Sequence, residues 1–285
     1  MVCTHFIDCC GYEMHIRQWG TPDKPALVMW HGLARLADDF DIIASRLADD
    51  YFILCPDTIG RGLSGWAKDP DSEYTLPFYG QQALAMLDHF GIEKCDWLGT
   101  SMGGLIGMGI AGALAPERIK RLILNDIGPE LDAGAVARIK AYVGTPPLFD
   151  TVKAAENLLR FIYAPFGIAS DAQWAHLAAR SVRRVTDGRF AFHYDPAVMT
   201  VFAAHIDEFD GWDIFSALQC PILLIHGARS DLITPAIVSK MCVMKPEMQV
   251  LSIAECGHAP YLNTDDQIRA VHDFLQDRRK IATNP

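Results

Sequence analysis

The chain has 285 residues, of which 50% are hydrophobic and 21% charged, so it can bury a large core and lacks the composition of a disordered protein. Acidic residues outnumber basic ones by 35 to 25, for a net charge of −10, which argues against nucleic acid as a partner because phosphate-backbone binders carry a basic face. No apolar run is long enough to span a membrane, and the N-terminal residues lack the basic and apolar regions of a signal peptide. We therefore expect a cytoplasmic protein with neither nucleic acid nor membrane as a partner.

The eight cysteines contain no C-x-x-C pair, and several lie inside apolar, strand-like runs. In a cytoplasmic chain such thiols behave as small buried hydrophobic groups. We expect reduced structural cysteines, no zinc site and no organic cofactor.

Short apolar runs recur along the chain, each bounded by Gly, Pro or Asp, and those that are apolar on both faces predict buried parallel strands. The first residues, about 5 to 19, predict one or two edge strands ahead of them. The predicted core strands are 26–32, 51–57, 94–101, 121–126, 221–227 and 248–255. Segments of helical length and period alternate with them, at 39–49, 75–91, 102–116 and 265–280. This alternation is typical of a doubly wound α/β sheet.

The alternation stops after residue 127, and residues 128–206 are rich in helical pattern, aromatic residues and arginine. We interpret them as an insertion between two parts of the sheet domain, 1–127 and 207–285. The insertion is nearly neutral, so the acidity belongs to the sheet domain.

The strongest motif is G-x-S-x-G at residues 99–103, placed directly after a predicted strand and directly before a predicted helix. A serine on so sharp a turn needs small residues on both sides, because a Cβ there would strike the neighbouring strand or helix. The turn would expose the hydroxyl of Ser101 at the carboxyl end of the sheet, where ligands bind in open α/β folds. Ser101 is therefore the candidate nucleophile.

A serine hydroxyl needs a base, and the base needs a carboxylate that fixes its tautomer. The candidate base is His258, on a loop after the last strand. Two aspartates compete for the third position. We favour Asp231, in the loop after strand 221–227, because a loop one strand before the histidine is the usual place for the acid, and the chain order Ser, Asp, His agrees with it. Asp126, at the end of strand 121–126, is the alternative acid.

Two backbone N–H groups would stabilise the oxyanion that forms when Ser101 attacks a carbonyl. Met102 follows the serine at a helix N-terminus and should supply one. Leu33 should supply the other, because Gly32 allows the bend that turns its N–H toward the serine.

Together, His31-Gly32, the loop DTIGRGLS at 57–64, the elbow at 99–104, Asp231 and Gly257-His258 resemble the α/β-hydrolase-fold serine hydrolases over nearly the whole chain. The resemblance implies an eight-stranded, mostly parallel sheet with residues 128–206 as a helical cap over the pocket. An Asp nucleophile is disfavoured, since position 101 is Ser.

The expected function is hydrolysis of a carboxylic ester or lactone of a small, largely apolar molecule through an acyl-enzyme on Ser101. A carbon–carbon bond hydrolase of ring-fission products and a non-catalytic ligand receptor are the alternatives. The small-molecule substrate is the expected partner, and a homo-oligomer is compatible with the sequence. Some of the cap aromatics should line an apolar pocket, while most form the core of the cap: Tyr142, Phe149, Phe161, Tyr163, Phe166, Trp174, Phe190, Phe192, Tyr194 and Phe202.

Overall fold

The computed structural model describes residues 2–141 and 146–277. Within them, eight strands form one sheet in the order β1-β2-β4-β3-β5-β6-β9-β10. The pairs β1/β2 and β2/β4 are antiparallel, and the other neighbours are parallel. The strands are β1 (Cys3–Cys9), β2 (Tyr12–Trp19), β3 (Ala26–Trp30), β4 (Phe52–Pro56), β5 (Cys95–Thr100), β6 (Ile119–Asn125), β9 (Ile222–Gly227) and β10 (Gln249–Ile253). The predicted mostly parallel sheet and its edge strands are confirmed.

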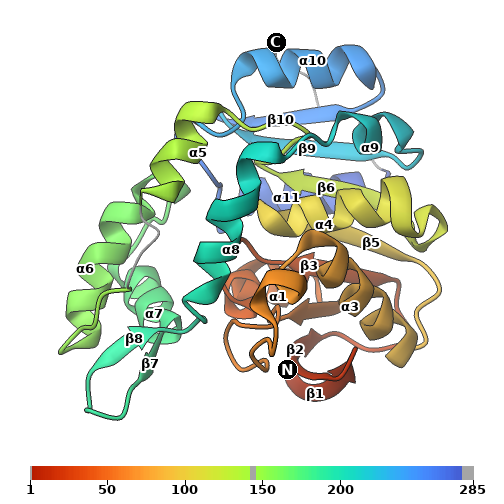
Figure 1. Ribbon diagram of the computed structural model, residues 1–285. Coiled ribbons are helices and arrows are strands. Elements are labelled where there is room, and N and C mark those ends of the chain that lie inside the picture. Colours follow the sequence, from red (N-terminus) through yellow and green to blue (C-terminus); the bar gives the residue numbers. More distant parts are fainter. Residues whose placement is uncertain (1, 142–145, 278–285) are drawn as a thin grey trace.

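Helices connect the parallel strands and cover both faces of the sheet (Figure 1). They are α1 (Asp41–Leu47), α2 (Pro70–Glu73), α3 (Leu76–His89), α4 (Met102–Gly109), α9 (Trp212–Ala217), α10 (Pro235–Met244) and α11 (Asp265–Leu275). Shorter turns are η1 (Ala37–Phe40) and η3 (Pro116–Arg118), and α4 continues into one wide turn, η2 (Ile110–Leu114). The predicted helix 265–280 ends earlier than expected, at Leu275, and residues 278–280 lie outside the described part of the chain.

Each face of the sheet has its own apolar core because side chains alternate along a strand. Residues of α3, α4, α9 and α10 pack on one face around Trp97, and residues of α1 and α11 pack on the other. In β5 every residue up to Gly99 is buried, which explains why its sequence does not alternate between apolar and polar residues, and its one charged residue, Asp96, pairs with Arg121. The sheet thereby forms a rigid base from which the loops at its carboxyl edge project.

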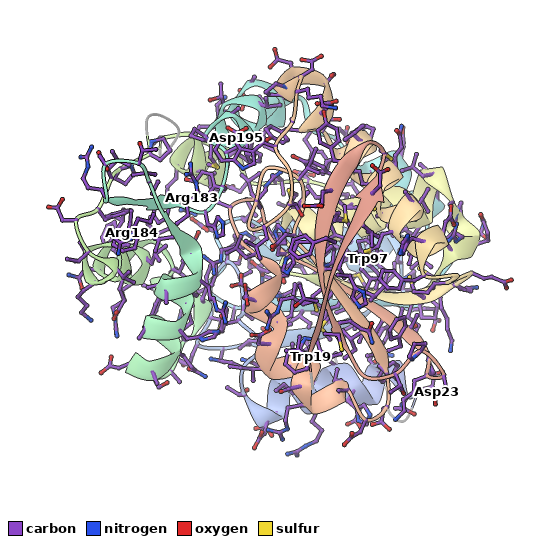
Figure 2. All side chains as sticks on the ribbon, turned by 90° about the horizontal axis from the view of Figure 1, so that it is seen from below. Trp19, Asp23, Trp97, Arg183, Arg184 and Asp195 are labelled. Atoms are coloured by element: carbon purple, nitrogen blue, oxygen red, sulfur yellow. The ribbon has the colours of Figure 1, made fainter. Side chains whose placement is uncertain are left out.

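The segment between β6 and β9 lies beside the carboxyl edge of the sheet (Figure 1). It contains α5 (Ala133–Lys140), α6 (Val152–Ile162), η4 (Ala164–Phe166), α7 (Asp171–Ser181), α8 (Ala197–His205) and η5 (Ile206–Glu208). It also contains a short antiparallel hairpin, β7 (Val182–Arg184) and β8 (Phe190–Phe192), which the helical interpretation missed. Arg183 and Arg184 lie in this segment, well apart from Trp97 in the sheet (Figure 2).

The inserted segment has a small core of its own, in which Phe149, Trp174, Leu177 and Phe192 are buried. That separate core is compatible with the predicted division at residues 128 and 206, which stays a prediction. In the described residues, every helix is too short or too polar to cross a membrane.

Candidate active site

Ser101 lies on the turn between β5 and α4 in a left-handed backbone conformation, with φ +52°. Neighbouring glycines make this turn sterically feasible. A Cβ on Gly99 would lie 2.2 Å from the backbone carbon of Gly103, and one on Gly103 would lie 2.1 Å from the carbonyl oxygen of Trp30. The motif is therefore built as its sequence predicts, with the serine at the carboxyl edge of the sheet.

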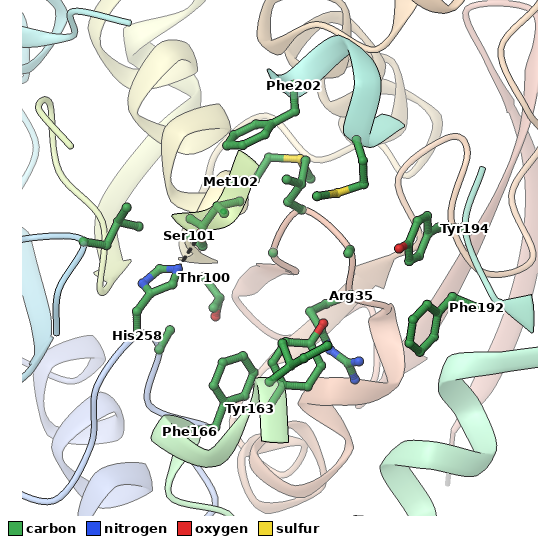
Figure 3. Close-up of a pocket in the computed structure, with 18 of the residues that line it drawn as sticks. Arg35, Thr100, Ser101, Met102, Tyr163, Phe166, Phe192, Tyr194, Phe202 and His258 are labelled. Carbon is green, nitrogen blue, oxygen red and sulfur yellow. Dashed lines mark hydrogen bonds between the residues drawn. The ribbon is translucent and has the colours of Figure 1, made fainter. Parts of the chain in front are cut away.

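A continuous hydrogen-bonded chain links three side chains at this edge. The Ser101 Oγ lies 3.0 Å from His258 Nε2, and Nδ1 of the same ring lies 2.9 Å from Asp126 Oδ2. The dashed line in Figure 3 marks the first of these contacts. The Asp126 carboxylate is fully buried, while the His258 side chain keeps 15% of its surface exposed on the cavity side. This is the arrangement in which a histidine can remove the serine proton.

The preference for Asp231 as the partner of His258 is wrong. Its side chain is half exposed and forms an ion pair with Arg138, with 2.6 Å between the nearest nitrogen and oxygen. The hydroxyl of the preceding residue, Ser230, donates instead to Asp126 Oδ2 at 2.6 Å. The loop after β9 thus reaches the site through Ser230, and Asp231 points outward. The alternative acid, Asp126, occupies the position.

The backbone at the end of β6 explains why Asp126 reaches the histidine. Asp126 has φ +53°, so the chain turns sharply and its side chain is directed along the edge of the sheet. The backbone N–H of Gly227, at the end of the neighbouring β9, donates to Oδ1 at 2.8 Å. With Ser230 and His258 on Oδ2, both carboxylate oxygens have partners, as a buried charge requires.

The loop that carries His258 is held on both sides. The Asn125 side chain donates to the Pro260 carbonyl at 2.9 Å, which ties the loop to the end of β6. The N–H groups of Gly257 and Tyr261 donate to carbonyls of η4 in the inserted segment, at 2.8 and 3.0 Å. Sequence reasoning missed Asn125 and Ser230, because a lone Asn or Ser at a strand end carries no pattern that distinguishes it.

The two predicted oxyanion donors come from the loop after β3 and from the first residue of α4. Leu33 and Met102 both line the same cavity as the serine. In the described part of the chain, neither backbone N–H donates to another group of the protein. A Cβ on Gly32 would lie 3.6 Å from the Ser101 Cβ, which shows how closely this loop approaches the nucleophile. Both N–H groups therefore have no acceptor among the described residues, and their role as oxyanion donors stays a prediction.

His31 has a structural position beneath the loop. Its Nε2 accepts from the backbone N–H of Thr58 at 2.9 Å, so the ring proton is on Nδ1, which donates to the Gly32 carbonyl at 2.7 Å. Burial lowers the pKa of His31 to about 4, outweighing the nearby Asp57, which raises it. A neutral His31 therefore supports the bend at Gly32.

Ser101 and His258 open into a cavity of about 320 Å³ between the sheet edge and the inserted segment. Figure 3 shows aromatic side chains of the inserted segment around this cavity. Of the predicted aromatic residues, Tyr163, Phe166, Phe192, Tyr194 and Phe202 line it. Phe161 is 73% exposed, Phe149 and Trp174 belong to the segment's own core, and Tyr142 lies outside the described residues. Arg35 is the buried charged residue of the lining, paired with Asp39.

Comparisons with known proteins agree with this architecture. Residues 25–265 match the family model described as alpha/beta hydrolase fold. The chain is 38% identical to a 3-hydroxybutyrate-oligomer hydrolase of Cupriavidus necator over 95% of this chain and 96% of that protein. It is 27% identical to the esterase YbfF of Escherichia coli, over 88% and 93% of the two chains.

Solved structures give the same result. A hydrolase structure from Rickettsia typhi superposes with a TM-score of 0.89 at 30% identity, covering 98% of this chain and all of that one. An alpha/beta hydrolase from Novosphingobium aromaticivorans superposes with a TM-score of 0.85 at 33% identity, covering 96% and 98%. The fold and its elbow define an α/β hydrolase. This chain belongs to the α/β hydrolase fold family, and the relatives named here are hydrolases.

Proposed function

We propose that this protein is a serine hydrolase that cleaves a carboxylic ester or lactone of a small, largely apolar molecule. The hydrogen-bonded chain Ser101–His258–Asp126, which opens into an apolar cavity, carries the proposal. No cofactor is needed, since nucleophile, base and acid are all side chains of this chain. Its expected partner is the small-molecule substrate.

The mechanism follows from these positions. His258 Nε2 takes the Ser101 proton as Oγ attacks the ester carbonyl, and the N–H groups of Leu33 and Met102 receive the oxyanion. Collapse of the tetrahedral intermediate expels the alcohol, which takes the proton from His258, and leaves an acyl-enzyme. Water, deprotonated by His258, then attacks the acyl carbonyl and releases the acid and free Ser101. Asp126, buried and fully hydrogen-bonded, stabilises the imidazolium that forms twice in the cycle.

The cavity and the relative from Cupriavidus necator suggest a narrower substrate class, short esters of hydroxy acids. The relative from Cupriavidus necator is named for 3-hydroxybutyrate oligomers. The cavity here is mostly apolar, yet Tyr163 and Tyr194 stand around it with Arg35 (Figure 3). Such a lining suits a short aliphatic chain that carries a few oxygen atoms.

A substrate panel on wild type and Ser101→Ala tests both the proposed ester hydrolysis and the narrower class of hydroxy-acid esters. We expect turnover of short p-nitrophenyl esters and of 3-hydroxybutyrate dimers and trimers, abolished in Ser101→Ala and unchanged in Ser239→Ala, an exposed serine on α10. A fluorophosphonate should label Ser101. Turnover confined to vinylogous diketo acids would point to carbon–carbon bond hydrolysis, and tight binding without turnover would point to a receptor.

A further inference from the structure

Arg61, in the middle of the loop DTIGRGLS, has a fully buried side chain. Among the residues that the structure describes, it forms no ion pair with a carboxylate. An unpaired buried charge is expensive, because the guanidinium loses its hydration without gaining an opposite charge. Packing alone therefore does not account for a charged guanidinium at this buried position.

The guanidinium contacts the two residues predicted to supply the oxyanion donors, Leu33 and Met102. Nε donates to the Leu33 carbonyl at 2.9 Å, and one terminal nitrogen lies 3.4 Å from the Met102 sulfur. The other terminal nitrogen donates to the Ile59 carbonyl and the Tyr79 hydroxyl, at 2.8 and 2.7 Å. The ring of Tyr79 lies 5.0 Å from the guanidinium carbon, which is within the range of a cation–π contact.

We propose that Arg61 is the positioning residue of the oxyanion hole. It holds the Leu33 carbonyl and the Met102 side chain and places an unneutralised positive charge behind the site of the developing oxyanion. The inference rests on the proposed function. Leu33 follows Gly32, whose backbone is the least restrained of any residue. The peptide that carries the Leu33 N–H is held through the Gly32 carbonyl, which accepts from His31 Nδ1 and from the Arg35 N–H. The bond from Arg61 holds the following peptide through the Leu33 carbonyl. With the peptides on both sides of Leu33 held, its backbone cannot rotate to turn the N–H away from the serine. Charge preset in this way costs no reorganisation during the reaction.

The loop that carries Arg61 is itself held firmly. The Gly62 N–H donates to the His193 carbonyl at 2.8 Å, and the Asp195 N–H donates to the Gly60 carbonyl at 2.7 Å. Asp195 is labelled in Figure 2. The Asp57 carboxylate accepts from the N–H groups of Ala37 and Leu63 and bonds to His15, so its charge is engaged elsewhere. Arg61 thus projects toward the oxyanion donors from a backbone that is fixed at several points.

Steady-state kinetics of Arg61→Met and Arg61→Lys test the proposal. The rates are divided by the concentration of active sites, which is measured by titration to the end point with a fluorophosphonate. We expect Arg61→Met to lower kcat by about 10²- to 10³-fold, the loss found when one oxyanion donor is removed. KM should stay within about threefold of wild type, because the contact acts in the transition state. Arg61→Lys should recover part of the loss, since an ammonium keeps the charge and one donor.

Inhibitor affinity separates positioning from a general loss of structure. A trifluoromethyl ketone forms an anionic adduct with the serine, whereas the matching secondary alcohol only fills the pocket. The affinity of Arg61→Met for the ketone should fall in parallel with kcat/KM, while its affinity for the alcohol stays unchanged. Arg121→Met is the matched control, because Arg121 is also buried but lies at the start of β6, paired with Asp96. It should lower thermal stability and leave kcat per titrated site unchanged.

The outcomes distinguish this inference from the proposed function. If Ser101→Ala is inactive but Arg61→Met keeps the wild-type kcat per titrated site, Arg61 is only structural and the inference fails alone. If Ser101→Ala hydrolyses esters as fast as wild type, the proposed function fails and the inference fails with it.

Discussion

At the scale of single residues, Asp126 and Asp231 are the two candidates for the acid that pairs with His258. Asp126 is buried and bonds to His258, whereas Asp231 is exposed and pairs with Arg138. We expect Asp126→Asn to lower kcat by about 10³- to 10⁴-fold, since the amide would hold the wrong tautomer of the histidine. Steady-state kinetics on a p-nitrophenyl ester measure the effect.

Asp231→Asn is the matched control for that substitution. It removes one exposed ion pair, worth at most about 1 kcal/mol of stability, and should keep the wild-type kcat. An impaired Asp231→Asn enzyme beside an active Asp126→Asn enzyme would contradict the assignment drawn from the structure.

The two aspartates also show where sequence reasoning stops. Both follow strands that end at the same sheet edge, and both give the order Ser, Asp, His, so chain order cannot separate them. The deciding feature is the left-handed conformation of Asp126, with φ +53°, together with the Gly227 N–H that faces it. Neither the backbone conformation of Asp126 nor the approach of the Gly227 N–H can be predicted from the residues next to Asp126. Ser101 and His258 were predictable because a G-x-S-x-G between strand and helix carries its own geometry.

At the scale of elements, the close contact between β5 and α4 requires glycine at position 99. A Cβ on Gly99 would lie 2.2 to 2.3 Å from backbone atoms of Gly103 and Gly104. Backbone cannot yield as a flexible side chain can, so Gly99→Ala should destabilise the fold by at least about 2 kcal/mol. Chemical denaturation measures the free energy of unfolding, and the ester assay should show a loss of activity in step.

Gly109→Ala, in the same helix, is the control for this prediction. A Cβ there meets nothing within 4 Å, so the substitution should be neutral or stabilise the protein by up to about 1 kcal/mol. Equal stability of the two variants would show that the turn relaxes freely and that the close approach of β5 and α4 is not needed.

The sheet was predictable at this scale, and the insertion only in part. Buried parallel strands are apolar on both faces and alternate with helices, a pattern visible over most of the chain. The hairpin of β7 and β8 has only three residues in each strand, too few to show a period. Phe192 is buried in a cluster that includes Phe149 and residues of α6 and α7, all distant from it in the sequence. Tertiary contacts therefore decide the local structure there.

At the scale of the whole molecule, the inserted segment contacts both halves of the candidate site. Its η4 carbonyls accept from the loop that carries His258, and its residues 193 and 195 bond to the loop that carries Arg61. The loops that carry His258 and Arg61 are therefore both held by one segment, which also supplies most of the aromatic cavity lining. A change in the orientation of the inserted segment would therefore alter the positions of His258 and Arg61 as well as the shape of the substrate cavity.

Stability of the whole fold should depend on pH through His31, which lies between these loops. Burial is the main cause that lowers its pKa from 6.5 to about 4, with Arg61 adding to the effect while Asp57 and Asp39 oppose it. Between pH 6.5 and 4 the unfolded chain binds a proton at this residue and the folded protein does not. Stability is therefore fully present above pH 6.5 and falls as the pH drops toward 4, by about 3 kcal/mol.

His31→Gln keeps a donor and an acceptor without a titrating group and isolates this contribution. Denaturation at several pH values should show the free energy of unfolding of wild type falling more steeply than that of His31→Gln between pH 6.5 and 4. The buried contact between Asp57 and His15 is present in both proteins, so its contribution cancels in the comparison. If the free energies of unfolding of the two proteins fell in parallel with pH, His31 would be taking up a proton in the folded state, which would contradict the prediction. The Thr58 N–H opposes that protonation, because it donates to His31 Nε2, which must stay an acceptor.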